Sequence, residues 1–311
     1  MVLDCVLLIV GFVALIAGAD ALIDGAASMA RRWGVSNLVI GATIVALGTS
    51  LPEMVVNLIS AYSGETDLAI TNIVGSNIIN TFVILGVTAC ICPILAQKSF
   101  RRFDIPLSAV SCLIVLVMLW IFDELNWVCG IVLAGTFAFY MYRMVMMSRS
   151  GEREIEDIDA LPLWRSLLMI AGGLVGLAVG GQLTVKCAVS IAEACGVSDA
   201  VIGLTVVALG TSLPELATSV IAAAKKNTDL AIGNIIGSNI FNVFFVLGLS
   251  SILNRLPAYD GVANDVLMAV AGSALVWLFV CTDRKKSMQW WHGAVLLVLY
   301  FVYLADMLVK I

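Results

Sequence analysis

The sequence predicts an all-α integral membrane protein with ten transmembrane helices, arranged as two inverted five-helix repeats with broken motif helices. Three observations predict this fold class. The 311 residues are 61% hydrophobic and only 13% charged, whereas an ordinary soluble domain carries about 25% charged residues. Ten apolar stretches are long enough to cross a bilayer. One long apolar segment also occurs twice, and each copy contains a polar, helix-breaking motif.

The ten expected helices are stretches of roughly 20 or more mainly apolar residues, the length that spans the hydrocarbon core. They lie at 3–30, 37–62, 67–92, 103–122, 125–147, 163–190, 198–223, 229–254, 264–282 and 289–309. The first stretch is long and has no small-residue cleavage site after a short apolar core. We therefore expect it to be retained as a helix and not removed as a signal peptide.

Basic residues gather in the loops on one side of this arrangement. The side reached after the first helix holds 14 of the 17 Lys and Arg residues: Arg31, Arg32, Lys98, Arg101, Arg102, Arg143, Arg149, Arg153, Arg165, Lys225, Lys226, Arg284, Lys285 and Lys286. By the positive-inside rule this side is cytoplasmic. Both termini are then expected outside a plasma (inner) membrane, on its periplasmic face. A miscounted helix would scatter these charges over both sides, so the bias supports ten spans.

The duplicated segment is the most informative feature of the chain. Residues 39–86 align with 201–248 at a constant offset of 162 and share 30 identities in 48 positions. Gly-Thr-Ser-Leu-Pro-Glu occurs at 48–53 and again at 210–215. Gly-Ser-Asn-x-x-Asn occurs at 75–80 and again at 237–242. Five expected spans separate equivalent points, and an odd number turns the second copy upside down. Inverted repeats with interrupted helices are typical of secondary transporters.

Loop charge supports this inversion independently. The loop after the first motif helix, 63–67, has no basic residue, whereas the equivalent loop of the second copy begins with Lys225 and Lys226. We therefore expect a first five-helix repeat at 1–147, a polar cytosolic linker at 148–162 and a second five-helix repeat at 163–311. The two repeats are expected to form one integrated transport domain.

Glu53 and Glu215 are expected near the middle of the membrane, where inserting a carboxylate costs about 3 kcal/mol. A two-fold axis in the membrane plane would bring the two side chains together. Adjacent carboxylates in a dry site require cations or protons between them. Both glutamates could instead be protonated and serve only to hold helices together, but that reading leaves their oxygen-rich neighbours unexplained.

The neighbours of these glutamates offer only oxygen. Pro52 has no N–H, so the carbonyl of Gly48 loses its helical donor, and we expect a broken helix whose carbonyls face a cavity. Hydroxyls and amides stand nearby, among them Thr49, Ser50, Ser76 and Asn80. Oxygen ligands suit Na⁺ and Ca²⁺, whereas Zn²⁺ or Cu⁺ would require His or thiolate. For any single Ser or Thr, close helix packing is an equally good account.

Two further asparagines belong to the duplicated segment. Asn77 and Asn239 follow the serines of the two Gly-Ser-Asn sequences. We expect them to tie loops or helix ends together and not to bind ions.

With these motifs in a five-plus-five inverted arrangement, the chain resembles the Ca²⁺/cation antiporter superfamily, and most of all its prokaryotic sodium/calcium exchanger branch. The specific resemblance lies in 39–89 and 201–251, the alpha-1 and alpha-2 motifs. It implies alternating access, in which the first and sixth spans slide against the core. It also implies a central ion site that uses side chains of Glu53, Glu215, Asn80, Asn242, Thr49, Ser50, Ser76, Thr211, Ser212 and Ser238 and the carbonyls of Ala46 and Ala208.

Two details of the resemblance concern coupling. Proton-coupled Ca²⁺ exchangers usually have Gly-Asn-x-x-Glu where this chain has Thr-Ser-Leu-Pro-Glu, which favours Na⁺. Members that depend on K⁺, and some prokaryotic members, have Asp at the position of Asn242, so Asn in both copies argues against K⁺ co-transport. The site then has two formal negative charges, which balance one Ca²⁺ or two Na⁺.

The predicted function is secondary active exchange of Ca²⁺ for Na⁺ at a central two-Glu site. The alternative is a proton-coupled antiporter for Ca²⁺ or another divalent cation, and a channel would differ by needing no counter-ion. An enzyme is not predicted, because the single histidine, His292, and the Asp positions offer no Ser–His or paired-Asp site. ATP-driven pumping is not predicted either, because no phosphate-binding Gly-rich loop with a Lys is present. No cofactor, nucleic acid or obligate protein partner is expected; the partners are the transported ions and the lipid bilayer.

Overall fold

The computed structural model describes residues 2–149, 161–202, 205–206, 208–259 and 261–309, and this part is almost entirely helical. Eight of its helices are long and apolar enough to cross a membrane, and a bent pair, Asn37–Thr49 with Leu51–Ser63, makes a ninth. The chain is therefore a multi-pass membrane protein. The uninterrupted long helices are α1 (Val2–Trp33), α8 (Asp104–Phe122), α9 (Trp127–Arg149), α10 (Leu163–Ala194), α16 (Val262–Thr282) and α17 (Trp290–Val309).

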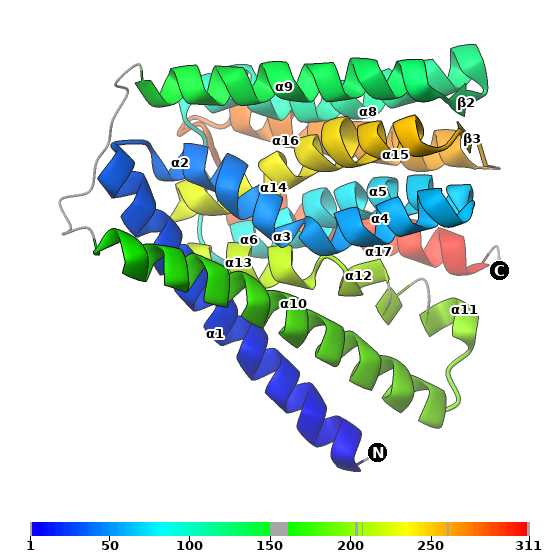
Figure 1. The fold of residues 1–311 in the computed structure, drawn as a ribbon, viewed down its shortest axis with the longest axis horizontal. Helices are drawn as coiled ribbons and strands as arrows, with labels where there is room; N and C mark the ends of the chain where they lie inside the picture. Colours follow the sequence, from blue (N-terminus) through cyan, green and yellow to red (C-terminus); the bar gives the residue numbers. More distant parts are fainter. Residues whose placement is uncertain (1, 150–160, 203–204, 207, 260, 310–311) are drawn as a thin grey trace.

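The duplicated segments form interrupted helices at the centre of the bundle (Figure 1). The first copy comprises α2 (Asn37–Ile40), the π-helix η1 (Gly41–Val45), α3 (Ala46–Thr49), α4 (Leu51–Ser63), α5 (Thr66–Ile78), the π-helix η2 (Ile79–Ile84) and α6 (Leu85–Ile91). The second comprises α11 (Asp199–Ile202), α12 (Ala208–Gly210), α13 (Leu213–Ala224), α14 (Thr228–Phe241), the π-helix η4 (Asn242–Leu247) and α15 (Gly248–Leu253).

The expected span at 198–223 is the one that neither a long helix nor the bent pair covers within the described residues. Its described helices are α11, α12 and α13, and α13 has only 12 residues. Gly210 precedes the break before α13, and Pro214 lies in the first turn of α13, where its missing N–H is tolerated. The other nine expected spans correspond to observed helices within a few residues of their predicted ends.

Short connections complete the chain. A five-residue helix, α7 (Lys98–Arg102), precedes α8. Four two-residue strands, which the sequence did not predict, pair antiparallel: β1 (Ile94–Leu95) with β4 (Ser287–Met288), and β2 (Glu124–Leu125) with β3 (Leu256–Pro257). Each pair joins two loops at one end of the bundle and supplies backbone hydrogen-bond partners where the helices end.

Burial separates a protein-covered centre from a periphery. In the apolar window of the helix from Thr228 to Leu253, 83% of residues are buried, compared with 22% in α1. Every residue of α14 from Leu230 to Phe241 is buried. Since a peripheral membrane helix presents its apolar face to lipid, this pattern places the duplicated segments where polar groups can be shielded from the bilayer.

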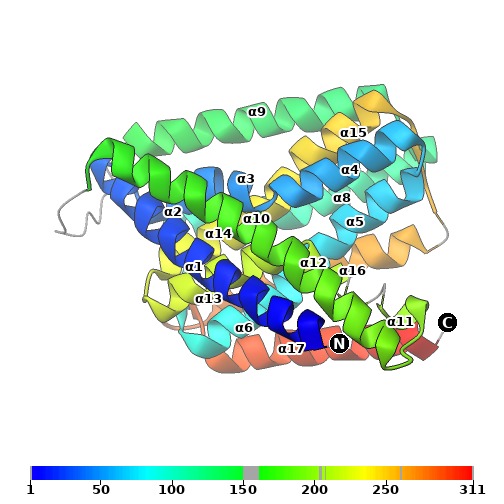
Figure 2. The same ribbon diagram turned by 60° about the horizontal axis from the view of Figure 1, so that its bottom comes forward.

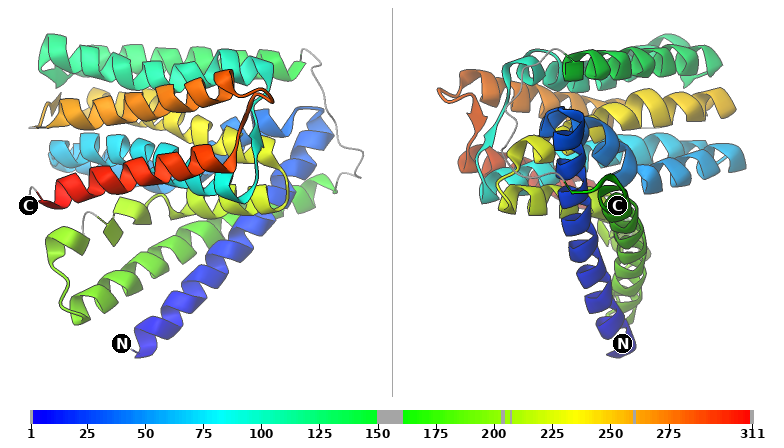
Figure 3. Two further views of the ribbon diagram at one scale, coloured as in Figure 1. Left: turned by 180° about the vertical axis from the view of Figure 1, so that it is seen from behind. Right: turned by 60° about the vertical axis from the view of Figure 1, so that its left-hand side comes forward.

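Helices α1 and α10 lie side by side and cross the other helices obliquely (Figures 2 and 3). Glycines allow their backbones to touch: a Cβ on Gly18 would lie 2.8 Å from the carbonyl oxygen of Gly173, and one on Gly173 would lie 2.7 Å from that of Gly18. Such small residues let membrane helices approach closely. The pair therefore forms one layer that packs against the centre.

Ion pairs hold α1 to the second duplicated segment. The Nζ atom of Lys225, which follows α13, lies 2.7 Å from Asp20 and 2.6 Å from Asp24. Burial lowers the pKa of Lys225, but the hydrogen bonds to both aspartates outweigh it and raise the pKa above its ordinary value. The lysine therefore stays charged and paired.

Candidate cation site

Each Gly-Thr-Ser-Leu-Pro-Glu sequence straddles a helix break, as predicted. Ser50 has φ −85° and ψ 9°, and Ser212 has φ −90° and ψ 7°, which places both outside regular helical geometry. A proline follows in the first turn of the next helix, and the first pair of helices is bent by 48°. The breaks bring the residues around them to the middle of the bundle.

The two motifs contact each other through their serines and glutamates. Ser50 Oγ donates a hydrogen bond to Glu215 Oε1 at 2.7 Å, and Ser212 Oγ donates one to Glu53 Oε1 at 3.4 Å. Both glutamates are at most 1% exposed. Each carboxylate is thus held by the serine of the other motif, so residues 162 positions apart form one buried cluster.

The second oxygen of each carboxylate accepts no hydrogen bond from the described part of the protein. Oε2 of Glu53 and Oε2 of Glu215 are buried and have no hydrogen-bond partner among the described residues. A buried, unpaired carboxylate oxygen is strongly unfavourable. These two atoms therefore require a proton or a cation.

Two π-helical segments that the sequence did not predict contain asparagines and pack against the helices of the glutamates: η4 contacts α4, and η2 contacts α13. Asn80 lies in η2 and Asn242 begins η4, and both are fully buried. Both polar atoms of Asn80 and the Oδ1 atom of Asn242 lack partners in the described part of the chain. Ser238 Oγ is likewise buried and unpartnered there. π-Helical turns frequently occur at functional sites, and here they place further unengaged oxygens in the cluster.

The threonines of the two motifs have different surroundings. Thr49 donates to Asn234 Oδ1 at 3.1 Å and lies 3.4 Å from the carbonyl oxygen of Ala46. That carbonyl accepts the N–H of Ser50 at 3.1 Å in addition to the Thr49 hydroxyl. Thr211 lies between α12 and α13, and Ala208 begins α12.

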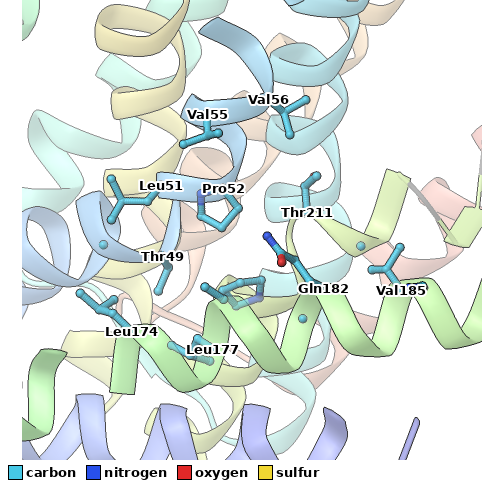
Figure 4. Close-up of a pocket in the computed structure, with 16 residues that line it drawn as sticks. Thr49, Leu51, Pro52, Val55, Val56, Leu174, Leu177, Gln182, Val185 and Thr211 are labelled. Carbon is cyan, nitrogen blue, oxygen red and sulfur yellow. The ribbon is translucent and has the colours of Figure 1, made fainter. Parts of the chain in front are cut away.

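A cavity of about 470 Å³ lies between the motifs and α10. Figure 4 shows Thr49 and Thr211 at this cavity, with Leu177 and Gln182 of α10 on its other side. The lining is mainly apolar, and Gln182 and Lys186 of α10 contribute polar groups. The threonines are therefore the edge of the cluster that is open to this cavity.

A second cavity, of about 350 Å³, reaches Ser76 and Thr211 from the side of the loop between α15 and α16. It is lined by a carboxylate that the sequence did not single out: Asp265 accepts the hydroxyls of Tyr259 at 2.8 Å and Tyr303 at 2.9 Å. Burial and this hydrogen bond raise the pKa of Tyr259 above its ordinary value. The phenol therefore remains a donor at neutral pH.

Sequence reasoning also missed the residues that orient the predicted ligands. Asn234 accepts the Thr49 hydroxyl and donates to Ser219 Oγ at 3.1 Å, and Asn77 accepts the amide of Asn242 at 3.3 Å. Both belong to the duplicated segment. Each has an asparagine at the equivalent position of the other copy: Asn72 for Asn234, and Asn239 for Asn77. This repeated asparagine was the feature of the sequence that could have revealed them.

Asn77 and Asn239, which were expected to tie loops or helix ends, connect the two copies inside continuous spans. Asn77 Nδ2 donates to the backbone carbonyl of Asn239 at 3.2 Å. The two residues lie near the C-terminal ends of α5 and α14. They therefore join the two copies next to the cluster.

The chemistry of the cluster is that of a hard-cation site. The cluster contains two carboxylates, amide oxygens and hydroxyls, and several of these oxygens are buried and lack protein partners within the described ranges. Ca²⁺ takes six to eight oxygen ligands of these kinds. The donor set therefore fits a hard cation.

Comparison with known proteins identifies the family of this chain. The family described as "Sodium/calcium exchanger protein" matches residues 3–146 and 165–309. The putative antiporter CaxA of Alkalimonas amylolytica is 35% identical over 97% of this chain and 98% of its own length. The inner membrane protein YrbG of Escherichia coli is 35% identical over 81% of each chain. A structure of the sodium-calcium exchanger NCX_Mj, soaked with Na⁺ and Ca²⁺, superposes with a TM-score of 0.86 at 33% identity over 98% of both chains. The chain belongs to the sodium/calcium exchanger protein family.

Proposed function

We propose that this protein is a secondary antiporter that exchanges Ca²⁺ for Na⁺ across the plasma (inner) membrane by alternating access. The observation that carries the proposal is the reciprocal contact of Ser50 with Glu215 and of Ser212 with Glu53, which leaves one buried, unpartnered oxygen on each carboxylate in the described part. Family membership and the named relatives support both the ions and the exchange.

The proposed ligands surround the two carboxylates. They are Glu53, Glu215, Asn80, Asn242, Thr49, Ser50, Ser76, Thr211, Ser212, Ser238 and the carbonyls of Ala46 and Ala208. Two formal negative charges balance one Ca²⁺ or two Na⁺. Since both kinds of ion use the same oxygens, full occupancy by one excludes full occupancy by the other, which is the basis of exchange.

The proposed topology has ten spans in two inverted five-helix repeats, with both termini outside. Corresponding elements begin 162 residues apart, as with α4 and α13 at Leu51 and Leu213 and with α5 and α14 at Thr66 and Thr228. This regularity supports the repeat, and opposite loop charges support its inversion. Most of the proposed cytosolic linker, 148–162, lies outside the described residues.

The proposed moving layer is the pair α1 and α10. Its glycine contacts support movement as one unit, since the two backbones touch at Gly18 and Gly173. The cavity beside α10 borders Thr49 and Thr211, whereas Lys225 ties α1 to the end of α13. This difference supports a state in which the cluster is accessible along α10 and closed along α1.

The decisive experiment is ⁴⁵Ca²⁺ flux into proteoliposomes under separately imposed Na⁺, K⁺ and H⁺ gradients. We expect uptake only when Na⁺ is present inside and can leave. Uptake driven by a pH gradient without Na⁺ would assign proton-coupled exchange instead. Equilibration of Ca²⁺ without any counter-ion would indicate a channel, and neither result is compatible with the proposal.

Asn242→Asp should change ion coupling. A third carboxylate raises the formal charge of the site from two to three negatives, so a further monovalent cation is needed for neutrality. We expect a several-fold change in the Na⁺ or K⁺ dependence of Ca²⁺ uptake at unchanged protein abundance, measured as initial rates over a cation titration. Asn264→Asp, which adds the same charge at an exposed position in the first turn of α16, is the matched control; identical ion dependence in both variants would contradict the prediction.

A further inference from the structure

A chain of hydrogen bonds links the asparagines of the two Gly-Ser-Asn-x-x-Asn sequences. Asn242 Nδ2 donates to Asn77 Oδ1 at 3.3 Å, and Asn77 Nδ2 donates to the backbone carbonyl of Asn239 at 3.2 Å. Asn239 Nδ2 in turn donates to Thr81 Oγ1 at 2.9 Å. All four residues are at most 2% exposed. This series of hydrogen bonds therefore lies in the interior, where water is not at hand to replace a lost bond.

The first bond determines which atom Asn242 presents to the cluster. A carboxamide has one oxygen acceptor and one NH₂ donor group. Because the NH₂ group is engaged by Asn77 Oδ1, the amide oxygen Oδ1 is the atom left without a partner among the described residues. A flipped amide would set two oxygens against each other at Asn77 and turn NH₂ toward a cation. Both contacts are repulsive, so Asn77 selects the orientation that can ligate a cation.

Asn77 is itself held in place. Its own NH₂ group donates to the Asn239 carbonyl and lies 3.8 Å from Cys112 Sγ of α8. These contacts fix the direction of Asn77 Oδ1, which is the acceptor that Asn242 needs. The orientation of Asn242 thus depends on a fixed partner from the other copy.

The equivalent arrangement is absent from the first copy within the described residues. The repeat equates Asn77 with Asn239 and Asn242 with Asn80. Asn239, however, donates to Thr81, and both polar atoms of Asn80 are unpartnered there. The residue equivalent to Thr81 is Val243, which has no hydroxyl. The hydroxyl of Thr81 therefore binds Asn239 in the first copy, whereas no hydroxyl at Val243 competes for Asn77, which bonds to Asn242.

We propose that Asn77 is a positioning residue that turns the amide oxygen of Asn242 toward the transported cation, so that Asn242 is the pre-oriented amide ligand of the site and Asn80 is not. This inference rests on the proposed function, because it concerns affinity at the same cluster. Losing one hydrogen bond that orients an amide ligand of a cation corresponds to a loss of about tenfold in affinity for that cation.

The test is a double-mutant cycle read by Ca²⁺ concentration dependence of uptake in proteoliposomes. Asn77→Ala should raise the KM for Ca²⁺ about tenfold, with a smaller change in maximal rate. In an Asn242→Asp background the same substitution should not raise KM, since both terminal atoms of Asp are oxygens and removing Asn77 Oδ1 only relieves an oxygen–oxygen contact. Equal increases in the two backgrounds would show that Asn77 acts only through packing and would overturn the proposal.

Asn239→Ala is the matched control, because it removes the equivalent side chain whose amide contacts Thr81 and not a proposed ligand. Its KM should remain within about twofold of the unchanged protein; an increase equal to that of Asn77→Ala would also overturn the proposal. Ca²⁺-dependent thermal stabilisation of the same variants in detergent measures binding without transport. If the unchanged protein shows no Na⁺-driven uptake, the proposed function fails; if it transports but the cycle shows no coupling, only this inference fails.

Discussion

Glu53→Gln and Glu215→Gln are each expected to reduce Na⁺-gradient-driven Ca²⁺ uptake to background. Gln keeps the size of Glu but lowers the formal charge of the cluster from two negatives to one. A buried Ca²⁺ is then uncompensated, and leaving a buried charge without its partner costs about 3–5 kcal/mol. That loss corresponds to a site weaker by roughly two to nearly four orders of magnitude. The measurement is initial ⁴⁵Ca²⁺ uptake in vesicles loaded with Na⁺.

The fold should survive these substitutions, because the oxygen of Gln can still accept the hydroxyl of Ser50 or Ser212. Thermal unfolding in detergent checks this point. Glu193→Gln, at an exposed position near the end of α10, is the control for loss of a carboxylate away from the cluster and should transport normally. Undiminished uptake in both Glu53→Gln and Glu215→Gln would refute a shared two-Glu site.

The features that could be predicted from sequence were those with local causes. Pro52 and Pro214 cannot donate a backbone hydrogen bond, so the break before each of them follows from the residue type alone. The long apolar stretches set the helices for a similar reason, since in lipid the backbone must satisfy itself. The duplication then indicated that Glu53 and Glu215 would meet, and the serine–glutamate contacts are consistent with that expectation.

The features that could not be predicted depend on contacts between distant segments. Asn80 and Asn242 lie in π-helical turns, which are wider than an α-helical turn, and no local residue type requires such turns. The bond from Asn242 to Asn77 crosses 165 positions. Asn239 has the same identity as Asn77 and an equivalent place in its repeat, yet it bonds to Thr81. Sequence identity between the copies therefore does not give identity of surroundings.

Gly237→Ala should test this difference most directly, because the equivalent residue Gly75 has different surroundings. A Cβ on Gly237 would lie 2.7 Å from both Cα and the carbonyl oxygen of Ala42 in η1, so the methyl group would force two backbones apart. Overpacking of this kind costs about 1–3 kcal/mol. A Cβ on Gly75 would meet no described atom within 4 Å, and Ala is the better helix former by about 1 kcal/mol.

We therefore expect Gly237→Ala to lower the thermal unfolding temperature in detergent and Gly75→Ala to leave it unchanged or raise it. Circular dichroism of the purified variants measures both, and an equal fall in the two would contradict the packing difference. Because both glycines precede the same Ser-Asn-Ile sequence, local sequence cannot explain a difference between them. The remaining cause is the close contact of α14 with η1, which also fixes the distance of Ser238 from the motif that contains Glu53. A methyl group at Gly237 would thus loosen the cluster as well as the helix packing, whereas one at Gly75 would do neither.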